Sequence, residues 1–344
     1  MNMEKLLSLM EKLSGIDGVS GNEDAVRQAI IEEIQDYCTY QVSPLGNLVA
    51  FKKGRRTPKR RWMISAHMDE VGFLITHITE DGYLKFTPVG GIDERVVIGK
   101  PVQINGSVYG VVGAKAVHVM SQEEKNTAPK ISDMQIDIGA ANRQQAMERV
   151  HVGDYGTFCS QFFRYGDGYF KGKALDDRAG CALLIALIQS DLEYDCHFVF
   201  GVQEETGFAG AVTSAYEVEP EIAIAVETTT AADVGGVPEE KQVCRLGDGV
   251  VLSFGDGSTN YDRGLFQYAK ATAQAQKIPY QVKEGAYSGT EAQAFQVSRS
   301  GVRTMAISLP CRYLHSPACV LQQRDLEPTL RLLKGMLEGD PAFD

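Results

Sequence analysis

The feature that most constrains the fold is a change, partway along the chain, in the pattern of apolar runs and turn residues. From Gly72 to about Phe163, short runs of Val, Ile and Phe are separated by the turn signals EDG, GG, NG and GD. This pattern is typical of a small all-β unit, either a sandwich or a barrel. Helical and strand-like segments alternate on both sides of the block. We therefore predict an α/β fold, a mixed-sheet α/β/α sandwich (residues 1–70 and 164–344) that is interrupted by an inserted, barrel-like all-β domain (residues 71–163).

The alternating segments supply the predicted elements of the sandwich. Apolar residues at helical spacing predict two opening helices, over residues 6–13 and 26–34, and the second follows the sequence SGNED, a typical helix start. After the β-rich block, helical and extended patterns alternate until the last helix. We expect helices over residues 176–190, 260–276 and 325–339, and strands over residues 196–203, 221–227, 250–255 and 302–308.

The charge balance excludes some classes of partner. With 45 acids against 34 bases, the formal net charge is −11, which argues against a general binder of nucleic acid or of membrane surfaces. One basic run, KKGRRTPKRR from Lys52 to Arg61, is interpreted as a solvated connection between strands, with a polyanion contact as the alternative. No stretch approaches the ~18 apolar residues of a membrane helix.

The seven cysteines lie scattered along the chain without a C-x-x-C pair. Neither a disulfide framework nor a cysteine zinc site is therefore predicted. The N-terminal segment places Lys and Glu within its apolar pattern, unlike a signal peptide. A reducing cytoplasm is the simplest location for such a chain.

Acidic residues and histidines gather where apolar elements end. Glu204 and Glu205 directly follow a strand that is predicted to be buried, and unpaired carboxylates there are costly unless they reach water or meet a positive charge. In an α/β sheet, the ends of strands are where ligands bind. Two histidines and several carboxylates form a ligand set that zinc or cobalt accepts. The segments concerned are SAHMDE, KALDDRAG, VQEETG, AVETTT and YLHSP.

The side chains at these strand ends can have different roles. Because the backbone turns at the end of a strand, Glu204 and Glu205 can approach one site from different angles, so that one binds metal while the other holds a water. A water that bridges two cations is acidified, and a free carboxylate can pass its proton to a leaving amine. Asp69 can fix the tautomer of His67, two positions before it. The other histidines are interpreted as structural: His77, His118, His151 and His197.

Taken alone, each short motif has a structural explanation. HMD fits a histidine and an aspartate that pair in a loop, LDDR fits the start of a helix, and EE fits the solvated end of a strand. Jointly and in this order, the segments resemble the M42 family of dinuclear-metal aminopeptidases. The resemblance covers essentially the whole chain and includes SGIDGVSGNED, LGNL, SAHMDEVGF, HVMSQEEK, IDIGA, KALDDRAG, QEETGFAGA and CRYLHSP. It implies a cytoplasmic enzyme that removes N-terminal residues from short peptides with two divalent cations per chain, zinc, cobalt or manganese. It also implies that the inserted β domain mediates subunit contacts, since relatives form homo-oligomers from dimers to dodecamers.

The resemblance implies a role for each candidate residue. Glu204 would be the general base, and Asp69 would orient His67. The implied metal ligands are His67 and Glu227 for one ion, Glu205 and His315 for the other, and Asp176 as the bridge between them.

Two residues depart from the family pattern. Glu227 in VETTT and Glu291 in SGTEA stand where the family usually has aspartate. Glutamate is one methylene longer, which moves a carboxylate by about 1.5 Å unless the backbone compensates. Our hypothesis is that the metal pair is retained and that the pocket for the substrate's α-amine is reshaped.

Three alternative functions stay open at the level of sequence. A related dinuclear carboxypeptidase or N-acyl-amino-acid deacylase would use the same ligands. A glycosidase also uses paired carboxylates, about 5 Å or 6.5 to 9.5 Å apart, but that reaction offers no reason for His67, Asp176 and His315. A non-catalytic assembly or binding protein would have lost activity through the two departures, since a fold does not guarantee its usual function.

Overall fold

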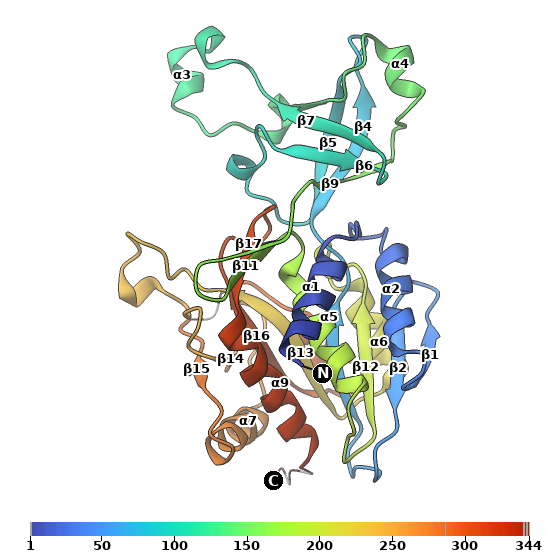
Figure 1. Cartoon of the computed structure of the whole chain (residues 1–344), viewed down its shortest axis with the longest axis vertical. Helices are drawn as coiled ribbons and strands as arrows, with labels where there is room; N and C mark the ends of the chain where they lie inside the picture. The colour runs from blue at the N-terminus through green and yellow to red at the C-terminus, as the bar shows by residue number, and fades with distance from the viewer. Residues whose placement is uncertain (1, 286, 340, 342, 344) are drawn as a thin grey trace.

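The computed structural model describes residues 2–285, 287–339, 341 and 343. Figure 1 shows two stacked parts, with a layered α/β sandwich below and a small β barrel above it. The barrel arises from the middle of the sequence, and both chain ends belong to the sandwich. This arrangement confirms the predicted α/β sandwich with a barrel-like insertion.

An eight-stranded mixed sheet forms the centre of the sandwich, in the order β1-β2-β12-β3-β13-β16-β14-β15. Strands β12, β3, β13 and β16 run parallel in its middle. The sequences of these strands are nearly unbroken apolar runs because helices cover both faces of the sheet. The strands are β1 (Thr39–Val42), β2 (Leu48–Lys52), β3 (Trp62–His67), β12 (Cys196–Gly201), β13 (Ile222–Thr230), β14 (Val250–Leu252), β15 (Tyr280–Val282) and β16 (Arg303–Cys311).

Two layers of helices enclose this sheet. Helix α5 (Leu175–Ile188) lies against β3 and β13 and is itself covered by α1 (Met3–Ser14) and α2 (Asp24–Ile34). Every residue of α5 is buried, and beyond the charged residues of its first turn the helix is apolar on all sides rather than amphipathic. Helices α7 (Arg263–Ala275) and α9 (Gln323–Leu337) pack on each other beside α5, and α6 (Ala209–Val218) and α8 (Ala292–Gln296) complete the sandwich.

The inserted block folds into a closed antiparallel barrel with the strand order β4-β5-β8-β7-β6-β9. Its core is separate from that of the sandwich and centres on Phe73, whose ring meets those of Phe86 and Phe158 edge-on at 5.1 and 4.9 Å. Short helical turns connect the strands, among them α3 (Gln122–Lys125) and α4 (Arg143–Met147). The barrel strands are β4 (Gly72–Ile78), β5 (Leu84–Val89), β6 (Pro101–Ile104), β7 (Val108–Gly113), β8 (Gln135–Asp137) and β9 (Tyr155–Phe158).

A three-stranded sheet that the sequence did not predict lies where the chain returns from the barrel. Strands β10 (Phe163–Tyr165) and β11 (Tyr169–Gly172) form a hairpin, and β17 (Cys319–Gln322) pairs with β11 from far along the chain. Strands of three or four residues carry too little alternation to be recognised alone. This sheet holds the loop before β17 close to the start of α5.

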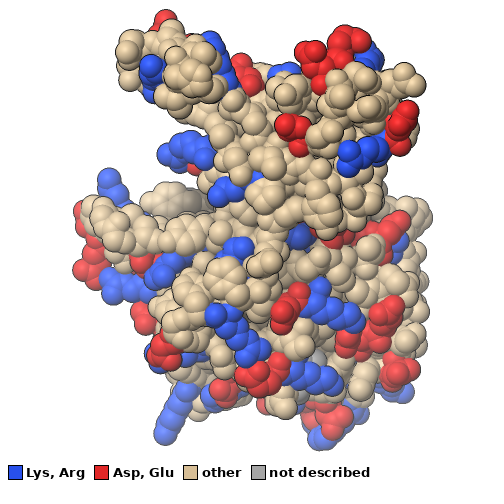
Figure 2. All heavy atoms as spheres, turned by 45° about the horizontal axis from the view of Figure 1, so that its top comes forward, with Lys and Arg blue, Asp and Glu red and all other residues tan. Residues whose placement is uncertain are grey.

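The surface carries mixed charge. On the face in Figure 2, basic and acidic side chains are interspersed over both parts of the molecule, without a continuous basic patch. Among the helices of the described residues, none is both long enough and apolar enough to cross a membrane.

Candidate metal centre

Three of the parallel strands bring their candidate residues to one edge of the sheet. His67 is the last residue of β3 and lies beside Gly201, the last residue of β12, so Glu204 and Glu205 follow immediately. On the other side of β3, Ala225 of β13 pairs with Ser65. Glu227, two residues further along β13, therefore stands level with His67. Parallel strands share one carboxyl edge, which is why segments far apart in sequence meet there.

Two further candidates, Asp176 and His315, reach this edge from the first turn of a helix and from a loop. Asp176 lies at the start of α5, where the neighbouring carboxylate of Asp177 accepts a hydrogen bond from the Gly180 N–H at 3.0 Å and caps the helix. The LDDR segment thus contains a helix start as well as a candidate metal ligand. His315 lies in the loop between β16 and β17 with a φ of 53°, a left-handed conformation that non-glycine residues adopt mainly under constraint at functional sites.

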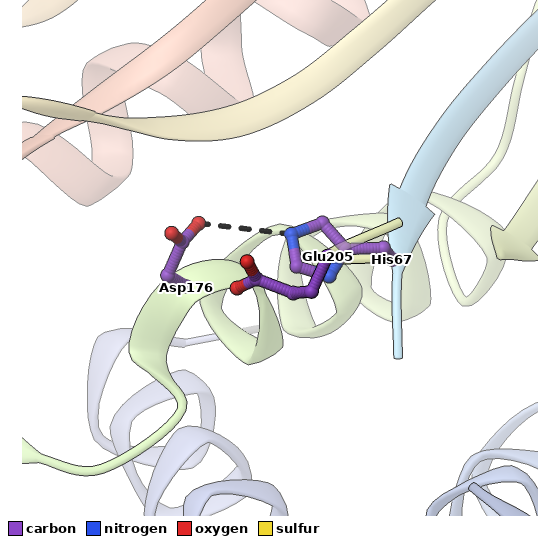
Figure 3. Close-up of side chains that lie close together, drawn as sticks. All are labelled: His67, Asp176 and Glu205. Atoms are coloured by element: carbon purple, nitrogen blue, oxygen red, sulfur yellow. Dashed lines mark ion pairs between the residues drawn. The ribbon is translucent and has the colours of Figure 1, made fainter. Parts of the chain in front are cut away.

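Asp176 lies between the two histidines. Its Oδ1 is 3.7 Å from His67 Nε2, and its Oδ2 is 3.4 Å from His315 Nε2. Glu227 Oε2 is 3.8 Å from His67 Nε2, while Glu205 Oε2 is 3.3 Å from His315 Nε2. Figure 3 shows His67, Asp176 and Glu205 pointing toward one another.

These distances suit ligands of a common ion. Two ligand atoms, each about 2.0 to 2.1 Å from a tetrahedral zinc ion, lie roughly 3.3 Å apart. Two sets of three residues have ligand atoms within 4.8 Å of one another: His67 with Asp176 and Glu205, and His67 with Asp177 and Glu227. Asp177 received no metal-related role from the sequence.

Two buried carboxylate oxygens support a cation at this edge. Glu227 Oε1 and Asp177 Oδ2 have no hydrogen-bond partner, although both residues are buried. An unpartnered carboxylate in a buried site is costly, and a bound cation removes that cost. The residues present therefore fit a metal centre.

The pKa values of the cluster residues also support a bound cation. Burial raises the pKa of Glu204 and of Glu205 to about 8, and further carboxylates around each of them add to the shift. Burial also raises the pKa of Glu227 well above its usual value. His315 behaves oppositely: burial lowers its pKa, but Asp176 and Glu205 outweigh this and raise it to about 10. The cluster thus contains more negative charge than its own protein groups neutralise.

Asp69 connects the ends of β3 and β12. Its Oδ1 lies 3.4 Å from His67 Nδ1, and its main-chain oxygen is closer, at 3.2 Å. The carboxylate also accepts hydrogen bonds from the backbone N–H groups of Glu204 and Glu205, at 3.0 and 3.1 Å, and from Ser20 Oγ at 2.5 Å. Burial alone would raise its pKa, but the bonds with His67, Ser20 and Glu204 lower it, so the carboxylate stays ionised. Asp69 therefore holds the strand ends that carry His67 and both glutamates.

Further contacts to the cluster come from groups that the sequence did not indicate. Thr228 Oγ1 donates to Asp176 Oδ1 at 2.8 Å, next to Glu227 on β13. His315 Nδ1 lies 2.7 Å from the main-chain oxygen of Gly91, in the loop after barrel strand β5. A backbone carbonyl has no sequence signature, so this contact between the barrel and the cluster becomes visible only in the fold.

Gly90 packs directly against the cluster and permits a test of this contact. Its φ is +80°, and an added Cβ would lie 2.8 Å from Val71 Cγ1 and 3.2 Å from Glu205 Cβ. We expect Gly90→Ala to displace Glu205 and to weaken metal binding about tenfold or more, measured by titration calorimetry. Gly106→Ala is the matched control, because Gly106 also has a positive φ of +64° but no atom within 4 Å of an added Cβ. Equal metal affinities of the two variants would contradict the prediction.

The other histidines lie apart from this cluster. His197 stacks on Phe51 with ring centroids 5.0 Å apart, and His151 is an exposed partner of Asp154 at 3.9 Å. Within the described part of the chain, His67 is the one histidine in the two sets of ligand atoms, and His315 joins the cluster through its distances to Asp176 and Glu205.

A cavity of about 490 Å³ opens onto the cluster, a size typical of small-molecule sites. The cluster residues, including Glu204, form one wall. The rest is lined by the end of β13, by Val243 and by residues of the segment that follows β15, among them Lys283. The lower sandwich and the Gly91 loop of the barrel both contribute to this cavity.

Comparison with known proteins agrees with this geometry. The profile of the M42 glutamyl aminopeptidase family matches residues 46–332. A lysyl aminopeptidase of Pyrococcus furiosus is 34% identical over 350 residues, which cover 98% of each chain.

Two solved structures show the same fold. The aminopeptidase APDkam598 of Desulfurococcus kamchatkensis superposes with a TM-score of 0.93 at 31% identity, over 98% of this chain and 95% of that one. The TET1 peptidase of Pyrococcus horikoshii, described as able to assemble into a tetrahedron or a large octahedral shell, superposes with a TM-score of 0.85 at 34% identity, over 98% and 99% of the two chains. The chain therefore belongs to the M42 peptidase family and is a peptide hydrolase of the aminopeptidase type.

Proposed function

We propose that this aminopeptidase holds two divalent cations per chain and removes N-terminal residues from short peptides. The observation that supports this most directly is the placement of Asp176, whose two oxygens face two different imidazoles. In this proposal the ligands are His67 and Glu227 for one ion, Glu205 and His315 for the other, and Asp176 for both. Zinc, cobalt and manganese all suit this donor set.

Glu204 is the proposed general base. Its side chain lines the cavity, and Asp69 holds its backbone N–H. When bound, the ions polarise the scissile carbonyl and acidify a water. Glu204 accepts the proton of that water and delivers it to the leaving amine, a transfer that suits a carboxylate whose pKa burial has raised toward neutrality. Asp69 keeps His67 and Glu204 in place during this transfer.

The acidic cavity favours a substrate with a free amine. Five carboxylates line it: Asp93, Asp176, Glu204, Glu205 and Glu227. They attract a peptide α-ammonium, whereas a carboxypeptidase must bind a free carboxylate and a deacylase an uncharged acyl group. The relative from Pyrococcus furiosus is named a lysyl aminopeptidase, which agrees with a requirement for a free α-amine on the substrate.

A substrate panel tests the proposed function. The metal-loaded enzyme should cleave aminoacyl-anilides and leave their N-acetylated forms and C-terminal substrates intact. Cleavage of blocked substrates at a similar rate would favour the deacylase or carboxypeptidase alternative. Activity on a polysaccharide that persisted after complete metal removal would favour the glycosidase alternative.

Anomalous scattering tests the metal number and the role of Glu227. Two ions per chain are expected, with Glu227 in the coordination shell of one of them. Fewer than two ions, or Glu227 outside both shells, would contradict our hypothesis that the metal pair survives the Asp-to-Glu change.

Metal affinity should rise with pH. His315 and the glutamates have raised pKa values in the metal-free protein, near 10 and 8. A group whose pKa is raised keeps its proton to higher pH, and this proton must leave before the group can bind metal. We expect the affinity to increase roughly tenfold per pH unit for each proton released. Titration calorimetry in buffers of different ionisation enthalpy measures the protons, and a pH-independent affinity would contradict the prediction.

We further propose that the chain forms a homo-oligomer through residues 71–163, as an inserted domain. Large apolar side chains are exposed on this barrel, including Tyr109, Val117 and Val119, which are 65%, 67% and 57% accessible. Such side chains are typical of contact surfaces. The Pyrococcus horikoshii relative assembles into large shells. Light scattering should show an assembly between a dimer and a dodecamer.

The proposed location of the enzyme is the cytoplasm. The seven free cysteines agree with action in this reducing compartment.

A further inference from the structure

We infer that Glu23 is a positioning residue for the reaction, because its carboxylate holds the backbone turn that carries Glu204 and Glu205. The inference rests on the proposed function of these two glutamates as the general base and a metal ligand. Glu23 belongs to the segment SGNED, which the sequence indicated only as the start of a helix. In the folded chain this segment also contacts Asp69, which accepts a hydrogen bond from Ser20 Oγ.

Glu23 does not use its side chain to cap the helix that it precedes. It is the residue before α2, but its carboxylate makes no capping hydrogen bond to that helix. Oε1 instead accepts from the backbone N–H of Gly21 at 2.7 Å and from that of Gln203 at 3.1 Å. The residue is only 4% exposed, and a carboxylate is costly to bury without such donors. The side chain therefore serves the turn after β12 rather than its own helix.

Gln203 is the residue of this turn that most needs support. It lies between the end of β12 at Gly201 and the two glutamates, and its φ is 56°. A non-glycine residue keeps such a left-handed backbone only where its surroundings hold it there. The hydrogen bond from its N–H to Glu23 supplies this constraint.

Glu23 completes a row of side-chain acceptors along the turn. Four consecutive backbone N–H groups, from residue 202 to residue 205, donate to side chains at 3.0 to 3.1 Å. The acceptors are Asn47 for Val202, Glu23 for Gln203, and Asp69 for both Glu204 and Glu205. Strand β12 has ended at Gly201, so these side chains take over from the sheet in fixing the backbone.

The position of this backbone decides where two functional side chains lie. Glu205 Oε2 is 3.3 Å from His315 Nε2, and the Glu204 side chain lines the cavity. A rotation at residue 203 turns the chain immediately before both glutamates. Because a misplacement of about 1 Å can cost about 10²-fold in rate, the loss of one bond at residue 203 is enough to affect catalysis.

Glu23 acts through the backbone alone. It is not among the described residues that line the cavity. The proposed ligands of the two ions do not include it either. Glu23 therefore positions the groups that react and does not itself contact the substrate or the ions.

Two substitutions at residue 23 separate the hydrogen bond from the charge. Glu23→Asp keeps the charge and suits the start of a helix, but its side chain is one methylene, about 1.5 Å, too short for the Gln203 N–H. Glu23→Gln loses the charge but keeps an oxygen in the place of Oε1. If the backbone bond matters, the variant that keeps the charge is the one that loses function.

Glu23→Asp should lower kcat about 10- to 100-fold and weaken metal binding about tenfold, as the loss of a partner behind a metal ligand does. KM should stay within about threefold, because a general base acts in the transition state. Glu23→Gln should stay within about fivefold of the wild type in both kcat and metal affinity, the difference between a charged and a neutral acceptor. The measurements are steady-state kinetics on an aminoacyl-anilide and titration of the metal-free full chain with zinc, both well below the thermal transition of each variant.

Asp24→Ala is the matched control, because Asp24 directly follows Glu23 but its side chain is 83% exposed and pairs with Arg27. It should keep the wild-type kcat and zinc affinity. The inference is overturned if Glu23→Asp keeps both values, or if Glu23→Gln loses as much as Glu23→Asp. If the wild type cleaves no substrate with a free amine, the proposed function fails, and the zinc titration still decides whether Glu23 positions Glu205.

Discussion

Replacing Glu204 by glutamine should reduce kcat by about 10² to 10⁴-fold, the usual contribution of a general base. Glutamine has nearly the same shape but cannot accept the proton of the water. The backbone N–H of residue 204 still donates to Asp69, so the strand end stays in place. In the proposed ligand assignment, the Glu204 side chain holds no ion. Metal content, measured by elemental analysis, should therefore stay at the wild-type value.

The two readouts separate the roles that Glu204 could have. Loss of metal together with activity would make Glu204 a ligand, and an unchanged rate would remove it from the mechanism. Glu32→Gln is a suitable control, because the Glu32 side chain is 55% exposed and is not among the residues that line the cavity. It should change neither rate nor metal content.

The second large effect concerns Arg178, the last residue of the LDDR segment. Its side chain is completely buried. It donates to three main-chain oxygens, those of Leu13, Ile16 and Met68, at 2.6, 3.0 and 2.6 Å. These bonds tie α5 to the end of α1 and to the segment between His67 and Asp69. Arg178 thus supports the position of the site residues without facing the cavity.

Arg178→Met should destabilise the fold by about 3 to 5 kcal/mol, because the carbonyl groups of Leu13, Ile16 and Met68 each lose a hydrogen bond from a buried charged donor and Glu70 loses a nearby positive charge. Urea denaturation of the metal-free protein measures this change without a contribution from metal binding. Arg331→Met, which removes a 43% exposed side chain on α9, should cost less than about 1 kcal/mol. A similar loss in both variants would show that the buried bonds contribute little.

The sequence predicted the elements near the site with good accuracy. The apolar run before Glu204 became β12, the run before Glu227 became β13, and the segment after Asp176, which is apolar beyond Arg178, became most of the buried helix α5. These predictions succeeded because burial on both faces leaves a strong local pattern. Strand β14 ended earlier than predicted, at Leu252, since the glycine-rich segment after it turns away.

The partners of these residues were beyond sequence reasoning. Lys283 stands in no pattern that distinguishes it from a surface lysine, and the carbonyl of Gly91 has no side chain to recognise. Asp69 was predicted to orient His67, but its bonds to the backbone of Glu204 and Glu205 depend on the pairing of β12 with β3.

By itself, the sequence determined most of the strands and helices of the sandwich, the barrel-like character of the insertion and which residue types stand at the strand ends, because these features follow from local apolar spacing and turn residues. Only the tertiary structure decided how closely His67, Asp176, Glu227 and His315 approach one another, and that Lys283 lines the same cavity. The physical reason is that a shared sheet edge and long-range loop contacts depend on strand order, which local patterns do not encode.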